Sequence, residues 1–141
     1  MSARPTLIAA GPEQRNLAVV AFLDVVNYTA MMAEQEARTH ALWMNLLEGL
    51  IQPSITEHGG VTVKSLGDGV LARFGSALHA VEWADRLQQA TRARQGSPEP
   101  AVPYIELRIS IHVGEVILTP NDIFGESVNF AARILEHASP G

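Results

Sequence analysis

Residues 61–74 have the sequence VTVKSLGDGVLARF, and this stretch decides the fold. Two β-prone runs flank Gly67-Asp68-Gly69, a pattern typical of the turn between two antiparallel strands. A carboxylate at such a turn is usually solvated. A second acidic residue changes that interpretation, because Asp24 interrupts the otherwise apolar run Leu17–Val26. A charge in an apolar strand is costly to bury unless it is paired or binds a cation. Asp24 and Asp68 on adjacent strands therefore predict an oxygen-rich site for a hard cation such as Mg²⁺.

Composition bounds the class of protein. A chain of 141 residues is one domain with room for a substantial core. The net charge of −5 argues against nucleic acid or an anionic membrane as the main partner. The absence of cysteine excludes disulfides and thiolate metal sites and fits a reducing compartment. No apolar run is long enough to span a membrane and no signal peptide opens the chain, so we expect a cytoplasmic protein, although a segment outside this chain could tether it to a membrane.

The first half of the chain predicts a strand, two helical segments and the hairpin. We expect residues 1–16 to form a flexible leader and Leu17–Val26 to form a central strand covered on both faces. Asn27 or Thr29 can cap the next helix. A helical period runs from Glu34 to His58, with a kink or a new helical segment expected at Pro53.

The second half predicts a helix, a strand pair and a last helix. Ser76 can cap the first of these helices, whose expected buried stripe is Ala77, Val81, Ala84, Leu87 and Thr91. Residues 95–103 are a loop by composition. Apolar and polar residues alternate from Tyr104 to Val113, which indicates a strand with one buried face. We expect Gly114 to break or bulge it before Val116–Leu118, and a turn at 119–122 to lead to a helix through His137. This order of elements predicts an α+β sheet with helices packed on it.

Two polar residues mark the last helix. Asn129 and Arg133 are four residues apart and so share one helical face. Taken alone, these two residues would indicate an exposed polar helix face with no specific function. No histidine pair has the helical spacing of a metal site, so we assign no zinc site and expect the five histidines at the surface or at helix ends. They are His40, His58, His79, His112 and His137.

Four stretches together resemble the catalytic domain of class III adenylate and guanylate cyclases. They are FLDVVNYT at 22–29, KSLGDG at 64–69, DIFG at 122–125 and VNFAAR at 128–133. The resemblance covers about Leu17 to the end and implies a ferredoxin-like βαββαβ core sheet with helices packed on it. In that family further strands and a phosphate-contacting lysine follow the last helix. We therefore expect residues 17–141 to be a C-terminally incomplete cyclase catalytic domain, and whether this stretch alone is active stays open.

The resemblance implies a role for each acidic and phosphate-facing position. Asp24 and Asp68, with Val25 beside them, match the metal site, which holds two Mg²⁺ or Mn²⁺ ions. The backbone of Val25, Val26, Asn27, Tyr28 and Thr29 matches the segment that cradles the phosphates, in a place where the family often has a glycine and a phenylalanine. Two cations about 3.5–4 Å apart can activate the ribose 3′-hydroxyl and hold the triphosphate for in-line attack.

It also implies roles for the last helix and for base recognition. Arg133 matches the arginine that stabilises charge on the α-phosphate, and Asn129 matches the residue that orients the ribose. Lys64 and Asp122 match the base-reading pair. An ammonium donor with a carboxylate acceptor fits N1 and N6 of adenine, whereas guanine presents the reverse pattern on that edge. The pair therefore favours ATP.

The resemblance further implies a homodimer with two composite sites, in which the aspartates of one subunit face the Asn, Arg and base-reading residues of the other.

The leading interpretation is an adenylate cyclase, a lyase that makes cyclic AMP and pyrophosphate for intracellular signal transduction. A guanylate cyclase remains an alternative, as does an inactive nucleotide-binding or dimerisation module of a larger signalling protein. A diguanylate cyclase would share the metal chemistry, but the paired-glycine acidic hairpin motif is absent.

Overall fold

The computed structural model describes residues 15–95 and 105–139. Its elements are β1 (Arg15–Val25), α2 (Tyr28–Leu46), the π-helical turn η1 (Leu47–Ile51), α3 (Gln52–Glu57), β2 (Gly60–Leu66), β3 (Gly69–Phe74), α4 (Ala77–Gln95), β4 (Leu107–Leu118), β5 (Ile123–Phe124) and α5 (Glu126–Glu136). Most of the expected leader and of the loop at 95–103 lies outside the described residues. No described helix has the length and apolar character needed to cross a membrane.

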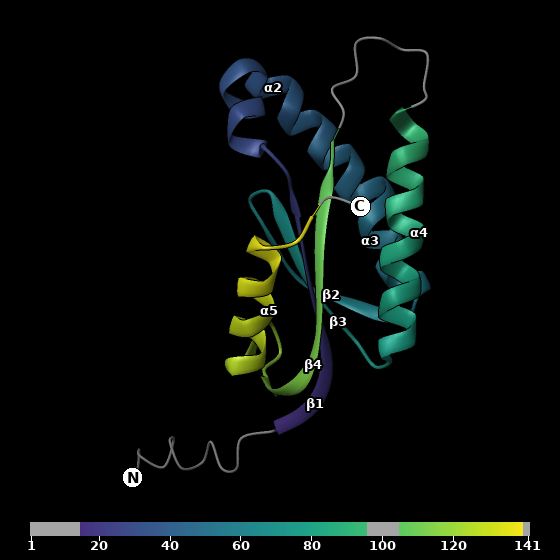
Figure 1. The fold of residues 1–141 in the computed structure, drawn as a ribbon, viewed down its shortest axis with the longest axis vertical. Coiled ribbons are helices and arrows are strands. Elements are labelled where there is room, and N and C mark those ends of the chain that lie inside the picture. Colours follow the sequence, from purple (N-terminus) through teal and green to yellow (C-terminus); the bar gives the residue numbers. More distant parts are fainter. Residues whose placement is uncertain (1–14, 96–104, 140–141) are drawn as a thin grey trace.

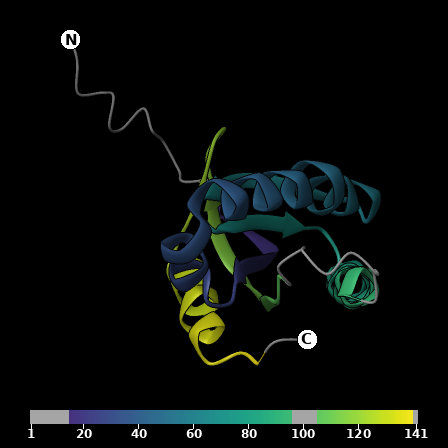
Figure 2. The same ribbon diagram turned by 90° about the horizontal axis from the view of Figure 1, so that it is seen from above.

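The sheet is antiparallel and has the strand order β2-β3-β1-β4-β5. Its first four strands have the order of a ferredoxin-like βαββαβ sheet, as the sequence predicted. β1 lies in the centre, between β3 and β4, and is buried on both faces. The helices α2, α3 and α4 cover one face and α5 covers the other (Figures 1 and 2).

The α2–α3 segment begins earlier than the helical period indicates. α2 starts at Tyr28 but is interrupted at Gln35, where φ is −146° and ψ is 72°. The interruption lies at the start of the helical period that the sequence shows from Glu34, so the first turns of α2 fall outside that period. The expected change at Pro53 is confirmed, because η1 precedes it and Pro53 lies in the first turn of α3.

The start of α2 differs from the expected cap. Asn27 occupies the N-cap position, but its side chain makes no capping hydrogen bond, and its φ of 59° is left-handed. Asparagine is one of the few non-glycine residues that adopt this conformation readily. The position therefore tolerates Asn27 where the family often has glycine.

The predicted buried stripe of α4 is right at Leu87 and Thr91 and wrong at its start. Val81 is 54% exposed and Ala77 is also exposed, whereas Ala80 and Trp83 are fully buried. Trp83 decides the rotation of the helix, because its ring packs against Phe74 and its Nε1 donates to Ser54 Oγ at 3.0 Å. The cap at Ser76 is confirmed, since its Oγ accepts from the His79 amide.

β4 continues through Gly114 without a break, contrary to the sequence prediction. Its pairing with β1 keeps one register from Leu107 to Ile117, with Gly114 opposite Ala18. A side chain at Gly114 would collide with Ser127 of α5, whose Cβ would lie only 2.9 Å away. The glycine therefore serves the close packing of α5 on the strand.

A β-bulge in the central hairpin decides which way Lys64 faces. Thr62 lies opposite Ala72, but Lys64 lies opposite Leu71, so β2 carries one extra residue. Residues directly opposite each other share a face, and Leu71 belongs to the core beneath α5. The bulge therefore turns Lys64 to the α5 face.

Gly69 allows β3 to approach β1 closely. A Cβ at Gly69 would lie 2.6 Å from the backbone oxygen of Leu23, whereas a Cβ at Gly67 in the same hairpin would meet nothing within 4 Å. Neither glycine has a positive φ.

We predict that Gly69→Ala destabilises the fold by about 1–3 kcal/mol, because backbone must move to admit the methyl group. Gly67→Ala is the matched control and should stay within about 1 kcal/mol of wild type. Urea denaturation followed by circular dichroism measures both. Equal stability of the two variants would contradict the close approach.

Candidate functional site

Lys64 and Asp122, which are far apart in the chain, form an ion pair on the α5 face. Lys64 Nζ donates to Asp122 Oδ2 at 2.9 Å. The other carboxylate oxygen accepts from the Ile123 amide at 2.8 Å, and the Asp122 amide donates to Thr119 Oγ1. The turn between β4 and β5 therefore holds Asp122 in place, while the bulge in β2 brings Lys64 to it.

The ion pair lowers the pKa of Asp122. The hydrogen bond from Lys64 is the main cause, and the bond from the Ile123 amide adds to it. The side chains are 43% and 23% exposed, so water and a ligand can reach both.

The pair lines a pocket together with Asn129 of α5. This pocket has a volume of about 320 Å³, and its wall also includes Phe22 and Gly125. Asn129 is shared with a second open pocket of about 560 Å³, which Arg133 also lines. Asn129 thus lies where the two pockets meet.

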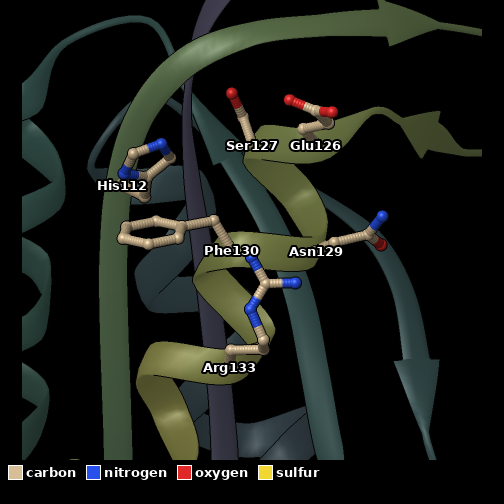
Figure 3. A pocket seen from close by; sticks show the side chains of 6 residues that line it. All are labelled: His112, Glu126, Ser127, Asn129, Phe130 and Arg133. Atoms are coloured by element: carbon tan, nitrogen blue, oxygen red, sulfur yellow. The ribbon is translucent and has the colours of Figure 1, made fainter.

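The second pocket contains an aromatic contact that the sequence interpretation missed (Figure 3). The rings of His112 and Phe130 lie 4.7 Å apart, and the guanidinium carbon of Arg133 lies 5.8 Å from the centre of the Phe130 ring. Such a cation–π contact favours one orientation of the arginine. The only sequence signal was that Phe130 adjoins Asn129 and that His112 lies on the polar side of its strand.

The two acidic residues come together where β1 ends and the central hairpin turns. Asp24 lies opposite Gly69 in the β1–β3 pairing, and the Val25 amide donates to the Asp68 backbone oxygen at 3.1 Å. Asp24 near the end of β1 and Asp68 in the turn between β2 and β3 are therefore neighbours. Neither residue lines the two pockets that hold Lys64, Asp122, Asn129 and Arg133.

Asp24 is paired with Arg108, a residue to which the sequence assigned no role. Arg108 Nε donates to Oδ1 at 2.9 Å and its Nη2 donates to Oδ2 at 2.7 Å, so the guanidinium engages both oxygens. These hydrogen bonds raise the pKa of Arg108, and the charges of Asp24, Asp68 and Glu136 add to the effect. Since the register places Asp24 opposite Arg108, only the strand pairing could have revealed the contact.

The segment expected to cradle phosphates is only partly available. The amides of Val25 and Val26 already donate to the backbone oxygens of Asp68 and Glu106. Tyr28 and Thr29 begin α2, where helical amides have no partner within the helix. An anion would therefore meet the residues after Val26, and the buried Val25 could offer a metal only its backbone.

The acidic pair fits a Mg²⁺-type ion. Within residues 15–95 and 105–139, no three His, Cys, Asp or Glu side chains gather as a metal-binding group. Mg²⁺ needs no such cage, because one or two carboxylates, waters and substrate phosphates commonly complete its shell. Two carboxylates at adjacent strand ends suit that chemistry.

Residues 11–141 match the family model described as the adenylate and guanylate cyclase catalytic domain. The chain belongs to this family, as its motifs predicted.

Relatives and solved structures agree with this assignment. The chain is 40% identical over 129 residues to "Putative adenylate cyclase 3" of Rhizobium meliloti, covering 91% of this chain and 22% of that protein. It is 31% identical to an adenylate cyclase of Streptomyces coelicolor, covering 91% of this chain and 32% of that protein. The chain thus spans about a fifth to a third of these two relatives. An adenylate/guanylate cyclase/hydrolase from Silicibacter pomeroyi matches with a TM-score of 0.81 and 35% identity, covering 92% of this chain and 74% of that one.

We predict that Lys64→Met raises the pKa of Asp122, because the main stabiliser of its charged form is lost. The folded-state pKa of Asp122 is lowered, so its contribution to stability is present above the unfolded value, near 4, and is lost as the pH falls through the folded value. Lys64→Met should remove that contribution. Carboxyl ¹³C NMR titration of Asp122 measures the shift.

Arg86→Met on α4 removes the same charge on the opposite side of the sheet and is the control. An unchanged Asp122 titration in Lys64→Met would show that the pair does not govern this carboxylate.

Proposed function

We propose that the protein is an adenylate cyclase that converts ATP to cyclic AMP and pyrophosphate in cyclic nucleotide signalling. The observation that carries the choice of ATP is the Lys64–Asp122 pair at 2.9 Å in one pocket with Asn129. An ammonium donor can meet N1 of adenine while a carboxylate accepts from N6. Asn129 lines the same pocket and would orient the ribose.

The residues of this chain have distinct tasks in the proposed reaction. Arg133 faces the open pocket beside Asn129 and would stabilise charge that develops on the α-phosphate. The first amides of α2 would contact phosphate oxygens at the helix N-terminus. Asp24 and Asp68 would hold Mg²⁺ or Mn²⁺, which supplies activation of the 3′-hydroxyl and neutralisation of the phosphates when bound.

We predict that the purified protein with Mn²⁺ forms cyclic AMP from ATP, and cyclic GMP from GTP at least about tenfold more slowly, since one reversed hydrogen-bond pair costs a factor of this order. Chromatography of the products measures both rates. Lys64→Met should lower the ratio of the ATP rate to the GTP rate towards one, while Arg86→Met should leave this ratio unchanged. Faster use of GTP would indicate a guanylate cyclase. Nucleotide binding without product would indicate an inactive module.

We also propose a homodimer in which each site draws on both subunits. The support is that the acidic pair lines neither of the two pockets that carry the base-reading and helix residues. A two-fold dimer can bring the acidic pair of one subunit to the pockets of the other.

Subunit mixing tests the shared site. Asp68→Asn and Arg133→Ala should each be inactive alone, and an equal mixture should recover about a quarter of wild-type activity. Half of its dimers are mixed and each mixed dimer keeps one complete site. Mixing Asp68→Asn with Asp24→Asn should restore nothing, because both changes affect the same half of the site. Native mass spectrometry verifies that mixed dimers form. If they form and the first mixture stays inactive, the shared site is wrong.

A further inference from the structure

The carboxylate of Asp24 is already occupied by a cation that belongs to the protein. Arg108 lies directly opposite Asp24 in the β1–β4 register and reaches both carboxylate oxygens, at 2.9 and 2.7 Å. The two side chains are only 28% and 20% exposed. Parallel hydrogen bonds from a planar guanidinium fix the position of both groups.

A divalent ion and this guanidinium compete for the same oxygens. A metal bound to Asp24 needs at least one oxygen lone pair, and its double charge repels a guanidinium held against the same carboxylate. Arginine stays protonated at any pH at which the protein folds. The competition therefore ends only when Arg108 moves away.

The two acidic residues differ in this respect. Asp24 is bound to Arg108 by hydrogen bonds, whereas Asp68 influences Arg108 through its charge alone. A cation that approaches the acidic pair consequently meets Asp68 with fewer constraints, and gains Asp24 only after the ion pair opens.

We propose that Arg108 is a positioning residue that acts as a built-in counter-ion for Asp24, lowering the affinity for the divalent metal until it is displaced. This inference rests on the metal site of the proposed function. A purely structural ion pair would join β1 to β4 and leave metal affinity unchanged, and this difference makes the two interpretations separable.

Direct Mn²⁺ binding, followed by the electron paramagnetic resonance signal of the free ion, tests the proposal without an activity assay. Arg108→Gln should bind Mn²⁺ about five- to tenfold more tightly than wild type, because the competing charge beside a dication is removed. Arg108→Lys keeps the positive charge but loses the paired hydrogen bonds of the guanidinium. Its affinity for Mn²⁺ should therefore fall between those of wild type and Arg108→Gln. The lysine variant also keeps the test decisive if Arg108→Gln does not fold.

Arg73→Gln is the matched control for overall charge. Arg73 is on β3, opposite Val20 of β1, and Val20 is four residues before Asp24 along β1. That separation is about 13 Å, beyond the screening length at physiological salt, so its effect should stay below about twofold. Equal tightening by Arg73→Gln and Arg108→Gln would overturn the proposal, as would unchanged or weaker binding by both Arg108 variants.

Asp24→Asn separates this inference from the proposed function. It should abolish the tight Mn²⁺ binding in both the wild-type and the Arg108→Gln backgrounds. If Asp24→Asn binds Mn²⁺ as wild type does, the metal site itself is wrong and the inference falls with it. If Asp24→Asn loses binding but neither Arg108 variant gains any, only the role of Arg108 is wrong.

Discussion

The structure depends on the antiparallel pairing of β1 with β3 and β4 at once. β1 is buried on both faces from Val19 to Leu23 and carries a charged residue, Asp24, one position before its end. At that point one neighbour supplies Gly69, which has no side chain to block the approach, and the other supplies Arg108, which neutralises the charge. A carboxylate can remain at the end of a core strand because both conditions are met.

The same packing separates the site into two halves. The acidic pair lies at the ends of β1 and the central hairpin, while Lys64, Asp122, Asn129 and Arg133 line pockets along α5. Two local devices build the second half. A bulge in β2 turns Lys64 to the α5 face, and Gly114 lets α5 lie close to β4. The bulge interrupts the regular pairing of β2, whereas β4 keeps its register through Gly114, and each device positions side chains of the candidate site.

Sequence patterns predicted what depends on local chemistry. The alternation before Gly114 and the glycine-flanked turn at Asp68 gave the strands, and the order of elements gave the sheet. The errors concern choices that only packing settles. Two stripes of α4 share Leu87 and Thr91, and the bulk of Trp83 selects between them. Gly114 looked like a strand breaker because the collision that it avoids involves Ser127, which lies in another element.

In the candidate site too, sequence motifs predicted individual residues, whereas contacts between distant parts of the chain could not be predicted. Motifs marked Asp24, Asp68, Lys64 and Asp122, but Arg108 stood in an ordinary polar position of an alternating strand. Its partner lies 84 residues away, and only the β1–β4 register joins the two. The amides of Val25 and Val26 are another case, because they donate to the turn at Asp68 and to Glu106, which precedes β4, and the local motif contains neither segment. A motif therefore identifies candidate ligand-binding groups, whereas the pairing of strands decides which of those groups are free to bind.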